Sequence, residues 1–585
     1  MNLELQKEKL FWLRGLLKNQ TAHNWGKISE ILALVKSSEK DFNFLDIEKY
    51  INTGTAFLTF DYGIDGVSIE ISKYAKSLEQ IYLPIGDCVI HLIGGDFYPQ
   101  ADNVLKHEWQ RFRIEGINGW SKWNEGKWFS KLYKQQMPDG SPISSHLAEE
   151  IFRQAVYIVE RLGKYMVENQ IFLLIPVNVA SNPGNLSLSL ALVLVTEAMG
   201  TYVINSNHDF YWEGGKPASE RKPGEAPGVR DHFFRNVDNI PFFNLLKTLY
   251  PWNGERWLQV NINRLQSRTL IDKFGFSIAQ VFKLTTSVGD KFFAPYDRKD
   301  VIYSRLRMAH ILSDGQPILN PIPIDDHLIK LREWMANQTP ITLGARQGLS
   351  VDPRNEGLLI LLQPTRVIAR KRIEKDMELI GSLLTNSELK SVFEKDSKRQ
   401  LLLHISGPTP REHQADLERI LNAYKDTLAA LPDFLANRIF LSFSVGNENH
   451  PSFKENGFKP LNIESIYQMA DAVLLPSQTE GRGLPIIESS ARGIPIICSR
   501  YQPHEVFKGV VGENLSEDLR INCIIFPEGK LDQDFLNEVA DILIKKGKYE
   551  DRWTLNQAAA RKRYSQQVLK RSFENFLRRF RRMRC

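Results

Sequence analysis

The sequence predicts an α/β fold of two Rossmann-like lobes, with a helical extension before the first lobe and a basic amphipathic helix after the second. The chain has 585 residues, whereas a single domain usually has roughly 100 to 200. Both halves alternate short apolar runs with segments of helical period, a pattern typical of parallel sheets covered by helices. Hydrophobic residues make up 42% and charged residues 25% of the chain, which excludes disordered and collagen-like proteins. No apolar run reaches the roughly 18 to 20 residues of a membrane-spanning helix.

Residues 1–50 are predicted to form the helical extension. They begin MNLELQKEKLFWLRGLL, in which Glu and Lys interrupt the apolar positions. The segment therefore lacks the uninterrupted apolar stretch and the cleavage site of a secretory signal. We expect an amphipathic helix that carries no catalytic residue.

Residues 51–340 are predicted to form the first lobe, with strands at 56–60, 88–93, 171–177, 201–205 and 257–260. Two insertions interrupt this lobe. Residues 118–133 are rich in aromatic side chains: Trp120, Trp123, Trp128 and Tyr133. We expect a flap that packs on its own lobe, with stacking on sugar rings as the alternative. Residues 214–230 (GGKPASERKPGEAPGVR) have little apolar surface and are predicted to form a mobile loop.

Residues 341–560 are predicted to form the second lobe. Strands are expected at 358–362, 401–405, 439–445, 472–476, 495–498 and 521–526. Apolar residues at helical spacing follow the first two strands, so we expect βαβ crossovers and a parallel sheet. The segments 320–323 and 339–357 are rich in Pro, Gly and polar residues, which places the boundary between the lobes near residue 340.

Residues 561–585 are predicted to form a basic amphipathic helix. Ten of the 75 basic residues and one of the 69 acidic residues lie between Arg561 and Arg584, which leaves 65 basic against 68 acidic groups elsewhere. The rest of the chain is therefore mildly acidic, and we expect no nucleic-acid partner. The helix has two candidate destinations: the first lobe, which would bury its apolar stripe, or an anionic membrane surface. In the second case, an otherwise cytoplasmic protein would contact the membrane peripherally.

The four cysteines predict neither a disulfide framework nor a metal centre. Cys88, Cys498, Cys523 and Cys585 lie far apart, with no CxxC pair and no histidine at ligand spacing. This usage fits a reducing compartment. A lone DxD pattern, Asp532 with Asp534, opens a late helix, and we expect no metal site there.

The most informative segment is LLPSQTEGRGLPIIESSARGIPIICS, residues 474–499. A strand is followed by a turn with two glycines and a proline, and then by a helix whose free N–H groups favour anions. Glu480 lies on the turn, and Glu488 lies on the helix. Ligands of open α/β sheets bind beyond the carboxyl ends of the strands, so we expect a binding site here.

This segment resembles the signature E-G-[FR]-G-L-P-x-x-E of glycosyltransferase family 4, whose members are retaining enzymes with the GT-B architecture of two Rossmann-like lobes and a deep cleft between them. The signature stands here as EGRGLPIIE, preceded by MADAVLLPS. The resemblance implies that Glu480 lies against the hydroxyls of the donor sugar and that Glu488 holds the ribose of the nucleotide. The backbone of Gly481, Arg482, Gly483 and Leu484 would then face the sugar and the phosphates.

Two cations follow the first strand of the second lobe, in QPTRVIARKRIE at residues 363–374. Arg366 and Lys371 would neutralise a diphosphate there, although a solvated charged turn is an alternative. The family has an Arg and a Lys at this spacing, and they bind the pyrophosphate of the donor and stabilise it as it leaves. The family often has glycine after the lysine. Arg372 at this position puts the geometry of the turn in question.

The first lobe shows weaker matches. Gly63 and Gly66 lie between a strand and a helix, as the first glycine-rich loop of the family does near the sugar phosphate, with Asp65 in place of one glycine. His208 follows a strand, and the family has a histidine at such a strand end, in contact with the donor sugar. The neighbouring Asp209, Trp212 and Glu213 become candidates for acceptor contacts.

The predicted function is the transfer of a hexose from a nucleoside diphosphate sugar to a hydroxyl acceptor with retention of configuration. A UDP-hexose is favoured over a GDP-hexose. The loop 446–459 is expected to face the base without identifying it. No further cofactor and no side-chain nucleophile are expected. The alternatives are a phosphorylase or epimerase of similar shape, or a nucleotide-sugar-binding protein without turnover. Motifs of dinucleotide dehydrogenases, P-loop NTPases and serine hydrolases do not occur.

Overall fold

The computed structural model describes residues 3–38, 54–63, 65–84, 86, 88–119, 128–324, 334, 337–410, 413–445 and 449–582. The chain forms two compact units. The first contains Met1–Thr286 together with Gln566–Cys585, and the second contains Ser287–Ser565.

The division after Thr286 differs from our expectation of a boundary near residue 340. Helix α10 (Arg298–Leu312) explains the difference, because it is built into the second unit. The buried guanidinium of Arg305 donates to the carbonyls of Leu358 and Met469 and pairs with Asp471 at 3.1 Å. These buried bonds satisfy the guanidinium only while α10 stays in place. The Pro- and Gly-rich segments therefore lie inside the second unit.

The described residues of the first unit contain a parallel sheet in the order β5-β3-β1-β6-β7-β8-β9. Its strands are β1 (Thr55–Leu58), β3 (Ile90–Gly94), β5 (Gln110–Arg113), β6 (Leu173–Pro176), β7 (Tyr202–Asn207), β8 (Trp257–Asn261) and β9 (Val281–Lys283). All five predicted strands are present. The two edge strands, β5 and β9, escaped prediction because they are short and β5 is largely polar. Strands β2 (Asp61–Tyr62) and β4 (Asp96–Phe97) pair separately.

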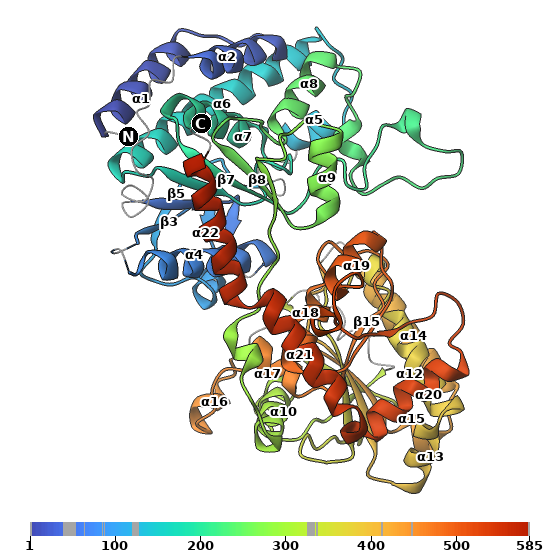
Figure 1. The fold of residues 1–585 in the computed structure, drawn as a ribbon. Helices are drawn as coiled ribbons and strands as arrows, with labels where there is room; N and C mark the ends of the chain where they lie inside the picture. Colours follow the sequence, from blue (N-terminus) through green and yellow to red (C-terminus); the bar gives the residue numbers. More distant parts are fainter. Residues whose placement is uncertain are drawn as a thin grey trace. The chain divides into compact units, whose positions relative to one another are not determined.

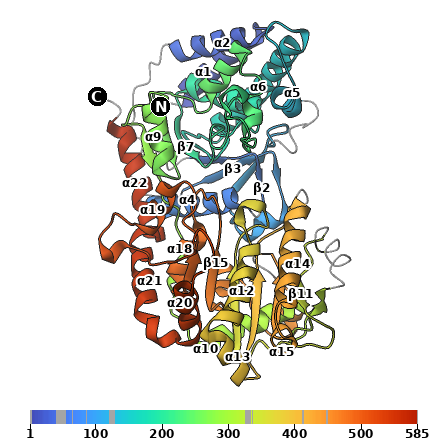
Figure 2. The same cartoon turned by 90° about the vertical axis from the view of Figure 1, so that its right-hand side faces the viewer.

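Helices cover both faces of this sheet, as Figure 2 shows for α1, α2 and α6 on one side and α4 on the other. The helices are α1 (Leu3–Lys18), α2 (Trp25–Ser37), α4 (Gly66–Tyr82), α5 (Ser130–Tyr133), α6 (Pro142–Glu168), α7 (Leu186–Met199), α8 (Ile240–Leu249), α9 (Arg264–Asp272) and α22 (Gln566–Arg582). Side chains of β1 alternate between the two faces: Ala56 and Leu58 join the core under α6 and α7, and Phe57 joins the core under α4. This period of two is what a strand buried on both faces requires.

The C-terminal helix α22 lies along α4, in the layer on the same face of the sheet (Figure 1). Its apolar stripe is buried there: Leu569, Phe573, Phe576, Leu577 and Phe580. This confirms the first of the two destinations predicted for the stripe. The helix begins at Gln566 and not at Arg561, because residues 561–564 end α21 (Glu550–Tyr564) in the second unit. Ser565 between the two helices is extended and bridges to Val288.

The two insertions of the first unit are described in part. Phe129 and Tyr133 are buried in its core, and Trp128 packs against that core. These residues of the predicted flap pack on their own lobe, as expected, whereas Trp120 and Trp123 lie outside the described residues. The loop 214–230 is closed at its base by Asp231, which accepts hydrogen bonds from the N–H groups of Lys216 and Gly228. Its predicted mobility stays a prediction.

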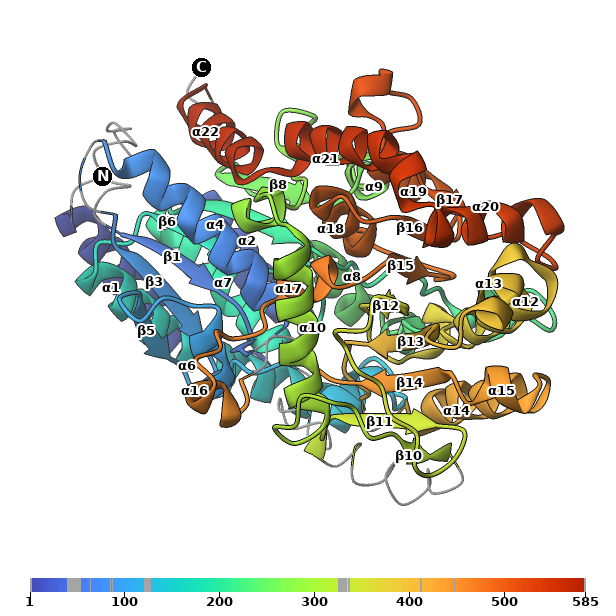
Figure 3. The same cartoon turned by 90° about the horizontal axis from the view of Figure 1, so that it is seen from below.

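The described residues of the second unit contain a sheet in the order β10-β11-β14-β13-β12-β15-β16-β17 (Figure 3). Its strands are β10 (Ile322–Pro323), β11 (Ile341–Gly344), β12 (Leu358–Gln363), β13 (Gln400–Ile405), β14 (Ile439–Phe443), β15 (Ala472–Leu475), β16 (Ile496–Cys498) and β17 (Ile524–Ile525). Neighbours are parallel except β11 and β14. The six predicted strands confirm the α/β fold. The antiparallel β11 escaped prediction because it lies in the segment interpreted as a hinge.

Two helical layers cover this sheet. Helices α12, α13, α14 and α20 contact one another over one face, and α10, α17, α18 and α21 lie over the other. The helices are α12 (Glu374–Asn386), α13 (Glu388–Lys395), α14 (Gln414–Ala429), α15 (Asp433–Ala436), α16 (Ser452–Glu455), α17 (Ile463–Gln468), α18 (Leu484–Arg492), α19 (His504–Val511) and α20 (Gln533–Ile544). Among the described residues of both units, no helix is long and apolar enough to cross a membrane.

Candidate functional site

The turn after β12 carries the two predicted cations. It consists of a loop from Pro364 and a short 3₁₀ helix, Ala369–Lys371, before α12 begins. The Lys371 side chain is buried, whereas Arg366 is exposed. The turn therefore presents one cation in the interior and one at the surface, both at the carboxyl end of β12.

Lys371 meets Glu480 from the loop after β15, so the structure joins residues 109 positions apart. The Nζ atom of Lys371 contacts Oε1 of Glu480, and both side chains are 9% exposed. Burial lowers the pKa of Lys371; the Glu480 carboxylate opposes this shift, and the positive charges of Arg370 and Arg366 add to it. The pair sits beyond two neighbouring parallel strands, β12 and β15, where ligands of open α/β sheets bind.

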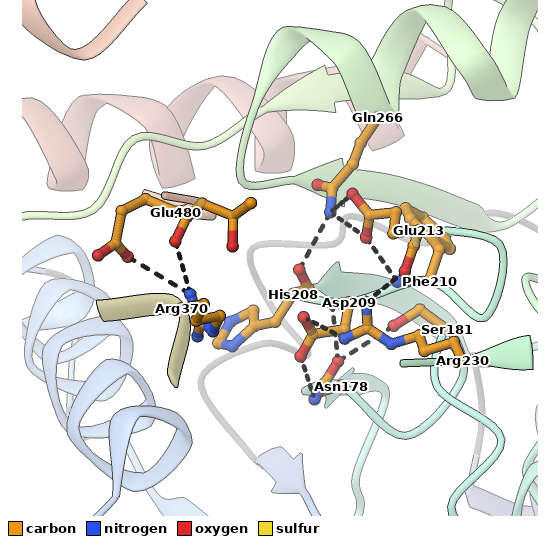
Figure 4. Close-up of polar contacts among 11 residues, drawn as sticks. Asn178, Ser181, His208, Asp209, Phe210, Glu213, Arg230, Gln266, Arg370 and Glu480 are labelled. Atoms are coloured by element: carbon orange, nitrogen blue, oxygen red, sulfur yellow. Dashed lines mark hydrogen bonds and ion pairs between the residues drawn. The ribbon is translucent and has the colours of Figure 1, made fainter. Parts of the chain in front are cut away.

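Arg370 is a further cation at this place that the sequence analysis did not single out. Its guanidinium donates to the carbonyl oxygen of Thr479 at 2.7 Å and lies 3.9 Å from Oε2 of Glu480 (Figure 4). Its backbone carbonyl accepts a hydrogen bond from the N–H of Gln478 at 2.7 Å. Glu480 thus lies between two cations, and its loop is bound to the turn that carries them.

The turn after Lys371 keeps a backbone conformation typical of glycine, although Arg372 occupies the position where the family often has glycine. The φ of 48° and ψ of 43° of Arg372 lie in the left-handed region that glycine adopts without steric cost. The backbone therefore has the conformation that a glycine would favour, although arginine occupies the position. The side chain compensates with hydrogen bonds from Nε to the Pro476 carbonyl at 2.8 Å and from a terminal nitrogen to the Ser499 hydroxyl at 3.0 Å.

The signature glycines form the start of α18. Gly483 is its N-cap with φ 63°, and Pro485 occupies the first turn, where a proline loses no helical hydrogen bond. A Cβ atom at position 483 would overlap the hydroxyl of Tyr501. Gly481 is exposed, and Arg482 and Leu484 are partly exposed. Glu480 precedes this helix by four residues, and the contact of the helix N–H groups with phosphates stays a prediction.

Gly483→Ala is expected to lower kcat/KM at least tenfold, because either the start of α18 or the buried ring of Tyr501 must move to relieve the overlap, and small displacements of a site are costly. Gly493→Ala is the matched control. Gly493 ends the same helix with φ 75°, but apart from its own chain neighbours and helix backbone no described atom lies within 4 Å of its Cβ position. Both variants carry the left-handed strain of about 1–2 kcal/mol. Equal activities of the two variants, measured with equal melting temperatures, would contradict the prediction.

Glu488 is partly exposed on the second turn of α18 and accepts a 2.6 Å hydrogen bond from the hydroxyl of Tyr467 on α17. Tyr467 is fully buried, and burial together with the Glu488 carboxylate raises its pKa well above the usual value. The phenol therefore remains a donor that holds the carboxylate in place. Sequence reasoning missed Tyr467, because no local pattern relates it to a residue 21 positions later.

In the first unit, the loop with Gly63 and Gly66 starts helix α4. Asp65 is the N-cap, and its carboxylate accepts a hydrogen bond from the Ser68 N–H at 2.7 Å. The Ser68 hydroxyl in turn accepts a hydrogen bond from the N–H of Gly63. The residue that departs from the family pattern thus occupies the helix end with a negative charge, which opposes the binding of a phosphate there. Donor contacts of Gly63 and Gly66 remain a prediction.

His208 follows β7, and hydrogen bonds hold the backbone on both sides of it (Figure 4). Its carbonyl accepts a hydrogen bond from Nε2 of Gln266 at 3.0 Å, and the N–H of Asp209 donates to Oδ1 of Asn178 at 3.0 Å. Asn178 follows β6 with φ 63°, a conformation that asparagine tolerates better than most residues. Sequence reasoning predicted His208 but neither of the two amides that fix it.

The three acceptor candidates differ in their surroundings. Asp209 is about half exposed and pairs with Arg230 at 2.8 Å. Glu213 accepts hydrogen bonds from the Phe210 N–H and from Gln266, and burial raises its pKa to about 7. Trp212 stacks on Phe210 and Phe274. Asp209 therefore offers the most accessible carboxylate, whereas Glu213 and Trp212 have structural contacts of their own.

The DxD pattern starts a late helix, as predicted. Asp532 is the N-cap of α20, and its side chain accepts a hydrogen bond from the Phe535 N–H at 2.8 Å. No group of three or more His, Cys, Asp or Glu side chains that could hold a metal ion occurs among the residues the structure describes.

Several solved structures are similar to this chain. One is Anabaena HepE in complex with UDP and glucose, which is 11% identical over 90% of this chain and 99% of that one, with a TM-score of 0.48. Another is WaaG, a glycosyltransferase involved in lipopolysaccharide biosynthesis, with 11% identity over 89% and 99% and a TM-score of 0.47. Sucrose-phosphate synthase of Thermosynechococcus elongatus has 12% identity over 90% and 98% and a TM-score of 0.45.

No curated protein matches the sequence. Residues 442–560 match the family described as "Glycosyl transferases group 1". The matched span includes the loop of Glu480 and all of α18. The second unit therefore carries a glycosyltransferase domain.

Proposed function

We propose that the protein is a retaining glycosyltransferase of GT-B architecture that moves a hexose from a nucleoside diphosphate sugar to a hydroxyl acceptor. The observation that carries the proposal is the buried Lys371–Glu480 pair beside the start of α18. A cation and helix N–H groups suit the diphosphate, and a carboxylate suits the hydroxyls of the sugar. In the first unit, His208 is proposed to contact the donor sugar, and Asp209 is proposed to face the acceptor.

In this proposal the bond between the sugar C1 and the diphosphate oxygen breaks as the acceptor oxygen bonds to C1 on the same face. The electron pair of the broken bond stays on the diphosphate, which takes up the proton of the acceptor hydroxyl. Lys371, Arg366 and the N–H groups of α18 stabilise the charge that develops on the leaving diphosphate, and Glu480 stabilises the positive charge on the sugar. Glu488, held by Tyr467, binds the ribose.

The donor is tested first by thermal shift with UDP, GDP and ADP. A ligand of the native state at about 100 times its Kd stabilises the protein by roughly 2.7 kcal/mol. We expect UDP to raise the melting temperature most. Equal melting temperatures with and without all three nucleotides would contradict a nucleotide-sugar site.

The reaction is tested with the corresponding hexose donor, with hydrolysis of the donor as an acceptor-independent readout. We expect a product with the anomeric configuration of the donor, measured by the proton coupling at C1 in NMR spectra. Because Lys371 and Arg366 supply the positive charge, activity should persist in EDTA. An inverted product would contradict the retaining mechanism, and nucleotide binding without any turnover would favour a non-catalytic protein.

A further inference from the structure

Arg372 connects three strand ends of the second unit. It belongs to the turn after β12, and its guanidinium donates to the carbonyl of Pro476 after β15 and to the hydroxyl of Ser499 after β16. Strands β12, β15 and β16 are neighbours in the sheet. One side chain thus ties together the loops that leave three adjacent strands at their carboxyl ends.

These ties enclose the proposed catalytic pair. Residue 370 is bound to the loop after β15 through the Gln478 N–H, and residue 372 is bound to it through Pro476. Lys371 lies between these two anchors, and its partner Glu480 lies two residues beyond Gln478. The N–H of Glu480 is itself bonded to the carbonyl of Gln502 at 3.0 Å. Both partners of the pair are therefore held at the level of the backbone.

The conformation of Arg372 shows that its side chain offsets a steric cost. The left-handed φ of 48° disfavours any residue with a Cβ atom. A glycine would fit this backbone without strain but could not make the hydrogen bonds of the guanidinium. Arginine presents its donors in a rigid fork, which matches two acceptors on different loops.

We propose that Arg372 is a positioning residue that locks the turn of Lys371 against the loop of Glu480 before the donor binds. Its consequence for nucleotide affinity rests on the proposed function, whereas the lock is a property of the free protein. Preorganisation of this kind lowers the ordering that binding requires. Removal of the lock should therefore weaken donor binding even where it relieves backbone strain.

Arg372→Gly tests this proposal directly, because it should relieve the backbone strain and yet weaken nucleotide binding. We expect a melting temperature equal to or above that of Arg372→Ala, together with about tenfold weaker binding of the nucleoside diphosphate in both variants by calorimetry. Arg372→Lys keeps the positive charge but not the fork, so it should bind the nucleotide as weakly as Arg372→Ala. Wild-type affinity in Arg372→Lys would overturn the proposal, because charge alone would then suffice.

Hydrogen exchange of the free protein tests the lock without any ligand. In Arg372→Gly we expect at least fivefold faster exchange in residues 366–371 and 477–481. Asp314→Gly is the matched control, because Asp314 also has a positive φ of 49° in the second unit and contacts none of these loops among the described residues. Unchanged exchange in both segments would overturn the proposal. Failure of the wild-type protein to bind UDP, GDP or ADP would instead refute the proposed function. The hydrogen-exchange result would then still test the lock, because it is measured on the free protein.

Discussion

Lys371→Ala is expected to lower kcat about 100-fold or more, because it removes a preorganised positive charge from a developing anion. Lys371 is buried against Glu480, so its charge is held at a fixed place. Hydrolysis of the donor or transfer to an acceptor provides the measurement. Arg366→Ala should also lower kcat, whereas Glu488→Ala should mainly weaken the binding of the nucleotide.

Stability must be measured beside activity, because the substitution leaves the buried Glu480 with only the guanidinium of Arg370, 3.9 Å away, as a cationic partner. Removing one partner of a buried pair typically costs about 3–5 kcal/mol. The double variant Lys371→Met with Glu480→Gln removes both charges and should regain stability while it stays inactive. Lys390→Ala is the control: Lys390 forms an exposed pair with Glu394 on α13, and such pairs contribute little. Wild-type kcat/KM in Lys371→Ala would show that the diphosphate binds elsewhere.

Phe573→Ala is expected to destabilise the first unit by about 3–5 kcal/mol, the usual cost of truncating a buried phenylalanine. Phe573 on α22 is completely buried, and its ring lies 5.2 Å from that of Tyr74 on α4. Deletion of residues 566–585 should destabilise that unit further, because it uncovers the apolar side chains of α4 and of the sheet that pack against α22. Calorimetry or hydrogen exchange of α4 measures both effects.

Arg578→Gln is the control on the same helix. Its side chain is 59% exposed and lies 3.9 Å from Glu574, so we expect a change of less than about 0.5 kcal/mol. Arg579 is unsuitable, because its Nε donates to the carbonyl of Ala279 at 2.9 Å. A truncated protein with an unaltered melting temperature would show that α22 is a detachable segment and would favour the membrane surface as its destination.

Features that repeat along the chain could be predicted from the sequence, whereas contacts between residues far apart in the chain could not. The central strands, the layers of helices and the stripe of α22 were all predictable, since each leaves a period of two or 3.6 residues in the chain. The edge strands β5, β9 and β10 were not, because strands this short carry no clear period, and the buried β11 was missed because it lies in the segment interpreted as a hinge. The boundary between the units also escaped, because α10 is placed by the buried contacts of Arg305 and not by composition.

Part of the candidate site could likewise be predicted from the sequence, and part could not. The sequence by itself determined that Glu480, Glu488, Lys371 and the glycines of α18 belong to strand ends and helix starts, because the motif and the spacing are local. Only the tertiary structure decided that Lys371 meets Glu480 and that Arg372 spans three strand ends from a left-handed backbone. Such contacts depend on which strands become neighbours in the sheet, and the order of strands in space is not the order along the chain.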